Sequence, residues 1–352
     1  MTGQAPPSHL DTGALIIGAG PAGLFQAFQL GLLEIPCRIV DALPYAGGQC
    51  VELYGHKPIY DIPGTPVTTG AELAESLLAQ IAPFQVPMHL GEQVATLQRE
   101  QPGEADSYWL ATTSAGTRFR AKAVVIAAGV GAFVPKRLSV EGAEGAEAHE
   151  GRSLFYHPSD LSRFAGQSVV VHGGEEAAVE AALGLVGMAR EVTLLHRRDV
   201  FRADDALLAA LRQRIDAGDI HIAVGQPSAF DGRSLTIDTP DGETRALPLD
   251  ALIVCQGISP RLGPIADWGL ELERKQIPVD TQRFQTREAG LYAVGDINTY
   301  PGKRKLIVSA FHEATLAAWA VAERVFDGKV PPLQYTTTST RLRELLGATP
   351  PR

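Results

Sequence analysis

Residues 14–24 of the chain, ALIIGAGPAGL, combine a short apolar run with three closely spaced glycines. These glycines, Gly18, Gly20 and Gly23, have the spacing GxGxxG, and an apolar helix is predicted from Leu24 to Leu30. Where a strand turns tightly into a helix, the first helical N–H groups lack partners and the helix end carries partial positive charge. The pattern therefore predicts a diphosphate site: Gly18 permits the turn, Gly20 admits the phosphates and Gly23 lets helix and strand pack closely.

A second apolar run, Cys37–Val40, follows this helix and ends in Asp41, about 20 residues beyond the glycines. A carboxylate at this place accepts hydrogen bonds from a free ribose diol and repels a 2′-phosphate. Strand, glycine turn, helix, strand and acid in this order are a specific signal for a dinucleotide site. We therefore expect the first turn to hold a dinucleotide without a 2′-phosphate.

The chain repeats this unit once. Ser168–Gly174 reads SVVVHGG and leads into a helical pattern, and Glu191–Arg198 is the next predicted strand. Its end offers Arg197 and Arg198, with Arg202 close by, where the first unit has its acid. Arginine donates charge-assisted hydrogen bonds of about 1.5–3 kcal/mol to a phosphate dianion. The second turn is therefore expected to hold a dinucleotide with a 2′-phosphate, so FAD and NADP(H) fit the two sites.

Two buried strands that end in glycine, Ala123–Gly129 and Leu249–Gly257, close the two units. The sequence therefore predicts an α/β fold of two Rossmann-like, three-layer ββα nucleotide-binding domains, with the second inserted in the first. Residues 1–129 and 258–352 would form the FAD-binding domain with a C-terminal extension. Residues 130–257 would form the NADP(H)-binding domain.

The local pattern predicts the remaining elements. The stretch from Gly47 to Gly64 reads as irregular, and Gly290–Asn298 reads as a strand that runs into Gly295 and Asp296. Asp296 can accept hydrogen bonds from the ribityl chain of FAD, a role compatible with capping the next segment. The other predicted elements are a helix at Ala71–Ile81, a small antiparallel sheet of Val94–Arg99, Tyr108–Thr113 and Arg118–Ala121, a linker at Val130–Gly151, a frayed N-terminal tail and a long helix within 305–328.

Charge and cysteine content restrict the partners and the compartment. The net charge of −9 argues against nucleic acid and anionic membrane as main partners. The cysteines Cys37, Cys50 and Cys255 form no CxxC, which gives no disulfide framework or thiolate metal site and suits a reducing cytoplasm. The N-terminus lacks the charged and apolar regions of a secretory signal, and the longest apolar run is too short to cross a bilayer.

The order GAGPAGL, GGQ, a buried strand with AAG, an inserted domain with HRRDVFRA and a late GDINTY is similar to that of low-molecular-weight thioredoxin reductases over nearly the whole chain. Those enzymes carry a CxxC in the inserted domain, and this chain has none. The segments LYGHKPIYDIPG, GAFVPKRL, RFAGQSVVV, LGPIADWGL and GDINTYPGK resemble more closely the thioredoxin-reductase-like ferredoxin/flavodoxin–NADP+ reductases, which also lack the cysteines and have a C-terminal extension.

This resemblance implies a homodimer in which hydride passes between NADP(H) and FAD, and single electrons pass to or from ferredoxin or flavodoxin. No catalytic side chain is expected, because the flavin carries the chemistry. By position, Tyr54 matches the residue on one face of the flavin, and Tyr335 is the candidate for the other. The candidate contacts are Gly18, Gly20, Pro21, Ala22, Gly23, Asp41, Gly48, Gln49, Tyr54, Asp61, Val94, Gly129, Phe133, Gly295, Asp296, Ile297 and Thr337 for FAD, and Gly173, Gly174, Arg197, Arg198 and Arg202 for NADP(H).

One position departs from the family pattern GGGDSA. Residues 173–178 read GGEEAA, so Glu175 replaces the second motif glycine. A carboxylate about 5 Å from a phosphate charge costs about 1–3 kcal/mol, which weakens NADPH binding by about 10- to 100-fold. Alternatively, Glu175 turns to solvent and Gly174 makes the contact. His172, just before the turn, is interpreted as a satisfied histidine at a strand end.

Several functions stay open at this point. Electron transfer between NADPH and a ferredoxin or flavodoxin is supported by the arginines. A flavin redox protein with an impaired NADP(H) site and another electron donor is supported by Glu175. A disulfide reductase that uses one cysteine, with Cys50 as the candidate, and a flavin module without turnover are the other two. An acidic carrier would need a local basic surface, which we expect around Lys303–Lys305 with Arg341 and Arg343.

Overall fold

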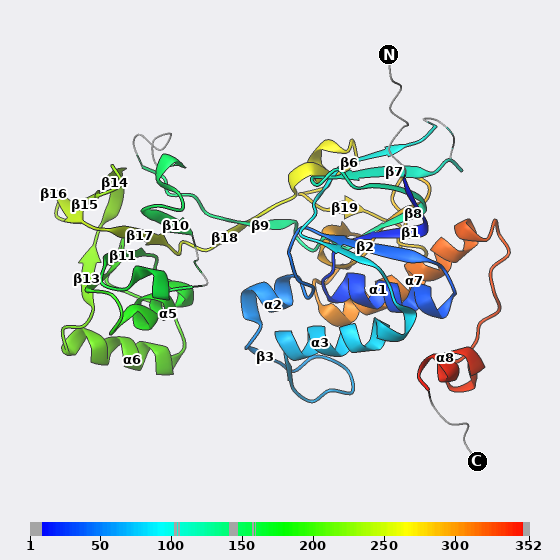
Figure 1. The fold of residues 1–352 in the computed structure, drawn as a ribbon, viewed down its shortest axis with the longest axis horizontal. Helices are drawn as coiled ribbons and strands as arrows, with labels where there is room; N and C mark the ends of the chain where they lie inside the picture. Colours follow the sequence, from blue (N-terminus) through cyan, green and yellow to red (C-terminus); the bar gives the residue numbers. More distant parts are fainter. Residues whose placement is uncertain are drawn as a thin grey trace. The chain divides into compact units, whose positions relative to one another are not determined.

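The computed structural model describes residues 9–101, 104, 106–140, 147–156, 158 and 160–347. The chain forms two compact units (Figure 1). Unit 1 comprises Met1–Ala132 and Arg261–Arg352, and unit 2 comprises Phe133–Pro260. The chain therefore leaves unit 1, builds unit 2 and returns. Of the predicted N-terminal tail, residues 1–8 lie outside the described residues.

Unit 1 is built on one sheet with the strand order β5–β2–β1–β8–β7–β6, and β20 also pairs with β8 (Figure 1). The neighbours β5, β2, β1, β8 and β20 run parallel, and β8, β7 and β6 form an antiparallel meander. The strands are β1 (Leu10–Ile17), β2 (Cys37–Asp41), β5 (Met88–Leu90), β6 (Val94–Arg99), β7 (Trp109–Thr113), β8 (Arg118–Ile126) and β20 (Leu291–Ala293).

Strand β8 joins the parallel and the antiparallel parts of this sheet. On one edge it pairs with β1 along almost its whole length, and on the other its first residues pair with β7 and its last ones with β20. The prediction of two separate strands, Arg118–Ala121 and Ala123–Gly129, is wrong. Lys122 does not interrupt the strand, because its ammonium donates to the carbonyl of Val325 at 2.9 Å.

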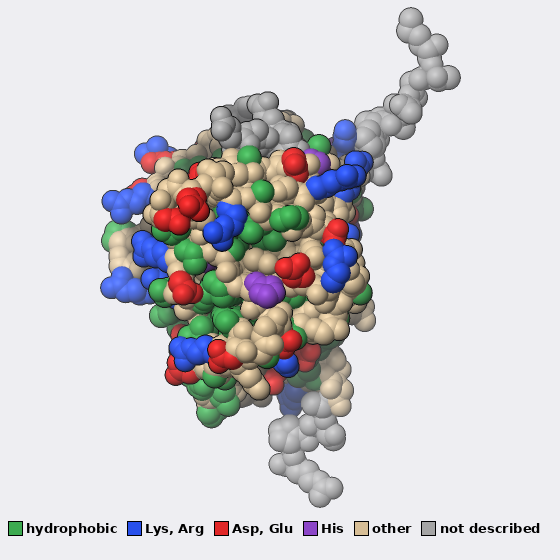
Figure 2. Space-filling view, turned by 90° about the vertical axis from the view of Figure 1, so that its left-hand side faces the viewer, with side chains coloured by type: hydrophobic (Ala, Val, Ile, Leu, Met, Phe, Trp, Pro, Cys, Tyr) green, Lys and Arg blue, Asp and Glu red, His purple; other side chains and the backbone are tan. Residues whose placement is uncertain are grey.

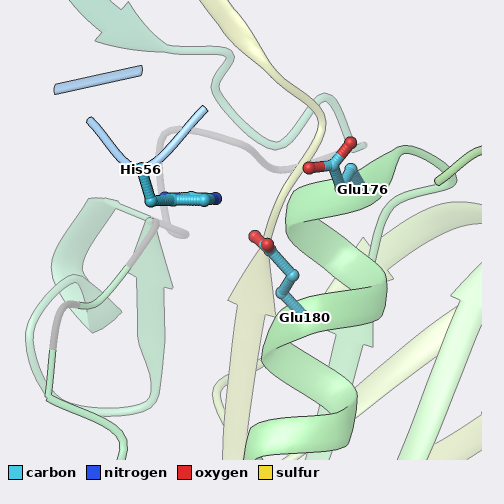
Figure 3. A group of neighbouring side chains, drawn as sticks. All are labelled: His56, Glu176 and Glu180. Carbon is cyan, nitrogen blue, oxygen red and sulfur yellow. The ribbon is translucent and has the colours of Figure 1, made fainter. Parts of the chain in front are cut away.

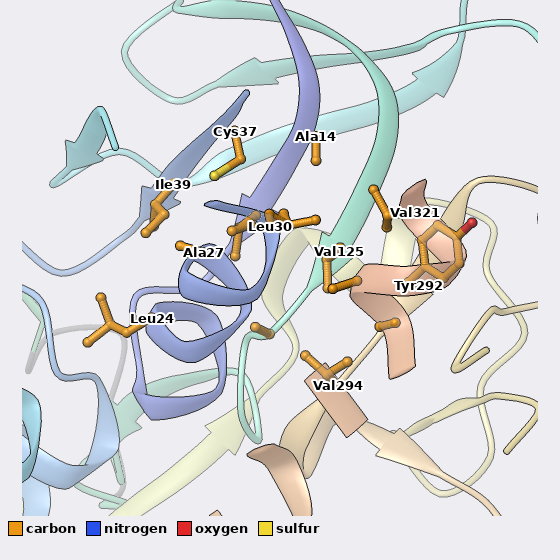
Figure 4. Close-up of a cluster of buried hydrophobic side chains, with 14 of the residues drawn as sticks. Ala14, Leu24, Ala27, Leu30, Cys37, Ile39, Val125, Tyr292, Val294 and Val321 are labelled. Atoms are coloured by element: carbon orange, nitrogen blue, oxygen red, sulfur yellow. The ribbon is translucent and has the colours of Figure 1, made fainter. Parts of the chain in front are cut away.

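Three helices, α1 (Pro21–Leu32), α3 (Gly70–Ile81) and α7 (Ile307–Val325), share one buried core with the parallel strands. On α1, Leu24, Ala27 and Leu30 recur at helical spacing, are fully buried and join Val125 of β8 in that core (Figure 4). The predicted helix at Ala71–Ile81 corresponds to α3, which starts with a capping box between Thr69 and Glu72. Alternate strand residues point to the other face and form a second core.

The stretch predicted as irregular, Gly47 to Gly64, contains the helix α2 (Gln49–Tyr54) and the strand β3 (Pro58–Ile59), which pairs with β4 (Thr68–Thr69). A helix of this length is too short to show a helical repeat of apolar residues. The chain of unit 1 ends in α8 (Thr340–Leu345), capped by Ser339. Other short elements of unit 1 are η1 (Ala82–Phe84), η4 (Gly263–Asp267), η5 (Gly295–Ile297), η6 (Thr336–Thr338), β19 (Ile277–Pro278) and β21 (Asn298–Thr299).

Unit 2 repeats the parallel arrangement with the strand order β10–β17–β11–β12–β13. Helices α5 (Glu176–Leu185) and α6 (Asp205–Asp216) contribute to its core, and a separate antiparallel sheet follows β13. The strands are β10 (Leu154–Tyr156), β11 (Ser168–His172), β12 (Glu191–His196), β13 (His221–Val224), β14 (Gln226–Phe230), β15 (Ser234–Asp238), β16 (Thr244–Pro248) and β17 (Ala251–Val254). The α/β prediction with two Rossmann-like units is confirmed.

The two connections between the units are themselves paired strands, β9 (Ala132–Pro135) and β18 (Ile258–Arg261). The predicted linker at Val130–Gly151 is therefore partly structured, since it also contains η2 (Glu147–His149). Its residues 141–146 lie outside the described residues. Among the described residues, we find no helix with the length and hydropathy of a membrane span.

Candidate nucleotide sites

The three motif glycines of unit 1 differ in how much space lies beside each Cα. Gly18 has a φ of +116°, and a Cβ there would lie 2.4 Å from the carbonyl oxygen of Ala127. A Cβ on Gly20 would meet one atom within 4 Å, the Cα of Gly48 at 3.9 Å. At Gly23 a Cβ would lie 1.9 Å from the carbonyl oxygen of Gly18. Gly18 and Gly23 are thus required by packing, whereas Gly20 leaves room for a ligand.

The N-terminus of α1 is open to an anion. Gly20 is its N-cap, no side chain caps it, and its first turn carries no acidic residue. Pro21 stands at the first helical position, where a missing N–H costs nothing. The N–H groups of Ala22 and Gly23 and the helix dipole then point toward the turn, as a diphosphate requires.

Asp41 closes this turn. Its Oδ2 accepts from the backbone N–H of Ala19 at 2.5 Å, and its Oδ1 accepts from Leu43 at 2.8 Å. Burial raises the pKa of Asp41, and the two backbone hydrogen bonds oppose this rise. Each carboxylate oxygen has a further lone pair, so the side chain can fix the turn and still accept from a ribose diol.

The loop before α2 lies against the same turn. The N–H of Gly47 donates to the carbonyl of Ala19 at 2.9 Å. A Cβ on Gly48 would lie 2.9 Å from the Cα of Gly20, and one on Gly129 would lie 2.1 Å from the side-chain nitrogen of Gln49. Four predicted contact residues from three distant segments are therefore brought together, and small residues keep the space between them open.

A fourth segment, η5, completes the group. Gly295 has a φ of +78°, and a Cβ there would lie 3.1 Å from the Cβ of Ala22 in the first turn of α1. Burial raises the pKa of the next residue, Asp296. The pKa of Tyr54 is raised, mainly by burial, with contributions from its hydrogen bond to Cys50 and from the charges of Asp296 and Asp61. Tyr54, Asp61 and Asp296 thus lie within electrostatic reach of one another.

Tyr54 and Asp61 also line an open cavity of about 540 Å³. Its other lining residues come from the end of α2 and from β3, and they are Leu53, Lys57, Pro58, Ile59 and Tyr60. The cavity is largely apolar and aromatic, with charged groups at its edge, which suits a flat aromatic ligand with a polar tail.

Other predicted contacts do not present a side chain to this place. The side chains of Val94 and Ile297 are buried in the second core of unit 1, so their contribution would come from the backbone. Phe133 lies in β9, and its side chain is outside the described residues. Tyr335 and Thr337 precede α8, which lies at the opposite end of unit 1 from α2 (Figure 1).

The turn of unit 2 follows β11. A Cβ on Gly173 would lie 2.3 Å from the carbonyl oxygen of Cys255, and one on Gly174 would lie 2.4 Å from the ring nitrogen Nε2 of His196. Both glycines are therefore fixed by packing within unit 2. Unlike Gly20, neither leaves open space beside its Cα.

Glu175 is the N-cap of α5, and its side chain does not hydrogen-bond to the helix. The carboxylate is 64% exposed and lies 3.7 Å from the guanidinium of Arg202, which is 80% exposed. The N–H of Arg202 donates to the carbonyl of Gly174 at 2.9 Å, which ties the arginine loop to the turn. Glu176 lies in the first turn of α5 and Glu180 one turn further (Figure 3). Unlike α1, this helix therefore starts among acidic side chains.

Two histidines, His172 and His196, form hydrogen bonds next to the turn of unit 2. His196 approaches the carbonyls of Arg198 and Val200 with Nδ1 at 3.0 and 3.1 Å, so it holds the loop that carries the exposed arginines. His172 is buried between the carbonyl of Leu195 and the side chain of Gln256. Burial lowers the pKa of His172 to about 4. The predicted reading of His172 as a satisfied histidine agrees with these contacts.

The basic surface predicted around Lys303–Lys305 requires a correction. The side chain of Lys303 is 7% exposed and pairs with the fully buried Glu313. Arg304 and Lys305 are exposed, whereas Arg341 pairs with Glu34. Glu313 was not predicted as a site residue, although an acidic residue inside an otherwise apolar helical pattern is a usable signal. On the face drawn in Figure 2, acidic and basic side chains are interspersed.

Each unit has a set of parallel strands and a glycine turn that leads from one of them, β1 or β11, into a helix. This arrangement defines a protein of the two-domain dinucleotide-binding class. A family comparison refines this. Residues 13–318 match the family described as pyridine nucleotide-disulphide oxidoreductase. The chain belongs to this family.

Curated relatives match along almost the whole chain. One is 54% identical over 355 residues, covers 98% of both chains and is named ferredoxin–NADP reductase of Acidovorax sp. (strain JS42). Another is 49% identical over 350 residues, covers 98% of this chain and 92% of the relative, and is named ferredoxin–NADP reductase 2 of Cupriavidus necator. The predicted resemblance to this group of reductases is confirmed.

Solved structures show the same architecture. The thioredoxin reductase of T. acidophilum is 25% identical, has a TM-score of 0.61 and covers 90% of this chain and 98% of its own. The bacillithiol disulfide reductase of Staphylococcus aureus is 17% identical, with a TM-score of 0.65 and coverage of 88% and 97%, and supports the fold alone.

Proposed function

We propose that this protein is an FAD-dependent reductase that transfers electrons between NADPH and a one-electron carrier of the ferredoxin or flavodoxin type. The observation that carries this proposal is the near 50% identity to ferredoxin–NADP reductases over almost the full length. The two turns with opposite charge, Asp41 in unit 1 and the arginines in unit 2, support it independently.

The residues of unit 1 fit FAD. The open N-terminus of α1 and the space beside Gly20 suit the diphosphate, and Asp41 suits the ribose. Asp296 would accept from the ribityl chain, and Tyr54 would lie along one face of the ring system. A bound flavin would supply acceptance of hydride and release of single electrons. The role of the protein is then to bind, orient and shield, which needs no nucleophile.

The residues of unit 2 fit NADP(H). Arg197, Arg198 and Arg202 are exposed beside the turn and would bind the 2′-phosphate. Gly173 and Gly174 would approach the diphosphate. Glu175 opposes this binding through its charge, but its exposed ion pair with Arg202 keeps the carboxylate beside the loop. The relatives give no support to the alternative of an impaired NADP(H) site.

A disulfide reductase that uses one cysteine is not favoured. All three cysteines are buried and free. Burial raises the pKa of Cys37 and Cys255 to about 12, and it also raises the pKa of Cys50. A reactive cysteine needs a stabilised thiolate, which none of these sites offers.

We further propose a cytoplasmic homodimer. Leu333 and Tyr335 are exposed on the segment before α8, and α8 lies away from α2, the helix that ends at Tyr54 (Figure 1). Tyr335 can therefore cover the flavin only if a second copy supplies it. Removal of residues 333–352 should convert dimer to monomer in sedimentation and increase flavin exposure to solvent. An unchanged dimer would contradict the role of this segment in association.

The test of the main proposal is anaerobic mixing of the purified yellow protein with NADPH and, separately, with NADH. We expect NADPH to bleach the visible absorbance of the bound flavin, because the flavin accepts the hydride, and we expect NADH to do so more slowly. Addition of an oxidised ferredoxin should then restore the colour. A colourless protein that takes up no FAD would overturn the proposal, and a yellow protein that NADPH fails to reduce would overturn its NADP(H) half.

A further inference from the structure

The side chain of Glu313, on α7, is fully buried although it is a carboxylate. Its partner Lys303 is 7% exposed and pairs with it through Nζ and Oε1. Two charges are kept out of water at considerable cost unless every remaining hydrogen-bonding position is satisfied. The hydrogen bonds of this buried ion pair therefore indicate which part of the structure it stabilises.

The hydrogen-bond partners of these two side chains lie in the segment that starts at η5. The Oε2 atom of Glu313 accepts from the N–H of Gly295 at 2.7 Å and from the Nδ2 of Asn298 at 2.9 Å. Its Oε1 atom accepts from the hydroxyl of Tyr300 at 2.8 Å. Lys303 Nζ also donates to the carbonyl of Gly295 at 2.9 Å. The acid and the base thus hold both backbone groups of one glycine.

That glycine is a sensitive point of the fold. Gly295 adopts a φ of +78° and lies beside Ala22 in the first turn of α1. The residue that follows it is Asp296, which the proposed function places on the ribityl chain. A small rotation of the backbone at Gly295 would move Asp296 relative to α1, and displacements of about 1 Å in such sites change function strongly.

We propose that Glu313 and Lys303 are positioning residues of the flavin site: their buried ion pair clamps Gly295 so that Asp296 and the first turn of α1 face one FAD molecule together. This inference rests on the proposed FAD site. It gives α7 an indirect part in cofactor binding, through the backbone of Gly295. It also explains why Lys303 is unavailable to a docking carrier.

The alternative is that the pair only stabilises the fold, and a matched lysine separates the two. Lys122 also binds α7, through the carbonyl of Val325 at 2.9 Å and through Asp327, but at the far end of the helix. The comparison is between Lys303→Met and Lys122→Met, each prepared as the FAD-loaded protein. The measurements are the thermal midpoint, the absorption spectrum of the bound flavin, and the rate of FAD release followed by flavin fluorescence.

Supporting residues around metal ligands are worth about 10- to 100-fold in affinity, and we expect FAD release from Lys303→Met to be faster by this order. Its flavin spectrum should shift, because a charge near the cofactor is lost. Lys122→Met should lower the thermal midpoint while its release rate and spectrum stay those of the parent. Because Lys303→Met alone leaves the fully buried Glu313 carboxylate without its counter-charge, the double variant Glu313→Gln/Lys303→Met is the second test, with the same expected loss of FAD.

If both variants at the pair release FAD at the parent's rate with the parent's spectrum, the positioning role is overturned and the FAD site stands. If the parent itself takes up no FAD, the proposed function fails before the variants are compared. If Lys122→Met releases FAD as fast as Lys303→Met, the pair acts through general stability, which also overturns the inference.

Discussion

At the scale of single residues, the second glycine position of each motif determines how closely the turn can approach a diphosphate. In unit 1 this position is Gly20, with open space beside its Cα. In unit 2 it is Glu175, whose carboxylate lies 3.7 Å from Arg202. An exposed ion pair of this kind contributes at most about 1 kcal/mol, so a phosphate can displace it. The carboxylate then remains near the diphosphate as a cost to binding.

Glu175→Gly should therefore strengthen NADPH binding. At a separation of about 5 Å the repulsion between the Glu175 carboxylate and a phosphate charge is on the order of 1–3 kcal/mol. Its loss should lower the Kd for the dinucleotide by about 10-fold or more. The variant also frees Arg202 for the 2′-phosphate. The Kd is measured by titration of the oxidised protein with NADP+.

Glu175→Gln is the control, because it removes the charge and keeps the volume. If Gln reproduces most of the effect of Gly, the charge is responsible; if it reproduces none, the side-chain volume is. A Kd in Glu175→Gly equal to that of the parent would show that the carboxylate does not face the diphosphate at all.

His172 gives a prediction for stability against pH. Burial lowers its pKa from 6.5 to about 4 in the folded protein. Between these two values the unfolded chain binds a proton that the folded chain does not, so stability is fully present above pH 6.5 and falls as the pH is lowered toward 4. From pH 7 to pH 5 the loss from this histidine is about 2 kcal/mol.

The measurement is urea unfolding of the parent and of His172→Asn at pH 7 and pH 5. The variant should be less stable at pH 7, since the contacts to Leu195 and Gln256 are lost, but its stability should change less between the two pH values. His221→Asn, on the exposed side of β13, is the control substitution. Equal pH dependence in the parent and His172→Asn would contradict the assignment.

At the scale of elements, periodicity and glycine spacing were sufficient for the turns and their helices. The GxGxxG of Gly18–Gly23 predicted β1, the turn and α1, because a tight turn, an open approach and close helix packing require glycines at this spacing. The helix α2 was missed, since its six residues carry too little pattern. Strand β8 was predicted as two strands, because a lysine between two apolar runs suggests an interruption. The hydrogen bond from Lys122 to the carbonyl of Val325 is not visible in the sequence.

Alanine substitutions at Gly20 and Gly23 separate the effect of an added methyl group on stability from its effect on FAD binding. Gly23→Ala would place a Cβ 1.9 Å from a backbone oxygen, so we expect a loss of about 3 kcal/mol or more in unfolding free energy. Gly20→Ala meets open space and should change stability by less than about 1 kcal/mol. Its methyl group would nevertheless occupy the place of the diphosphate, so FAD affinity should fall at least about tenfold.

Both variants are compared by urea unfolding of the apoprotein and by FAD titration. Unchanged FAD binding in Gly20→Ala would place the diphosphate elsewhere, and an unchanged stability of Gly23→Ala would contradict the packing role of Gly23. The two variants differ by three positions on the same turn and add the same atom, so each serves as the control of the other.

At the scale of the whole molecule, the repeat of one α/β unit inside the other could be predicted, because each unit carries its own local signals. Contacts between distant segments could not. Lys303 was predicted to lie on a docking surface because it is a charged residue next to two other basic residues. The sequence does not show that its ammonium pairs with Glu313 of α7. Tyr335 was paired with Tyr54 by family position, whereas within one chain α8 lies away from α2 (Figure 1).

Of the five basic residues predicted for this surface, Lys303 is buried, Arg341 pairs with Glu34, and the half-buried Arg343 donates to the carbonyl of Ser339. The exposed pair Arg304 and Lys305 is therefore the part of the surface that we test with an acidic carrier. Opposite charges on two proteins raise the rate of encounter, and salt suppresses this effect. The double variant Arg304→Glu/Lys305→Glu should therefore lower kcat/KM for an acidic bacterial ferredoxin about tenfold at low salt. With added salt near 0.5 M the difference should largely vanish, because the screening length falls to about 4 Å.

A second consecutive pair of exposed basic residues, Arg274 and Lys275, provides the matched control. Arg274→Glu/Lys275→Glu changes the net charge by the same amount, so a nonspecific effect of charge would appear in both variants. We expect the control to lose much less activity with the carrier at low salt, and both variants to keep the parent's rate of reduction by NADPH. Equal losses in the two variants would mean that the carrier responds to net charge, and no loss in either would remove Arg304 and Lys305 from the docking surface.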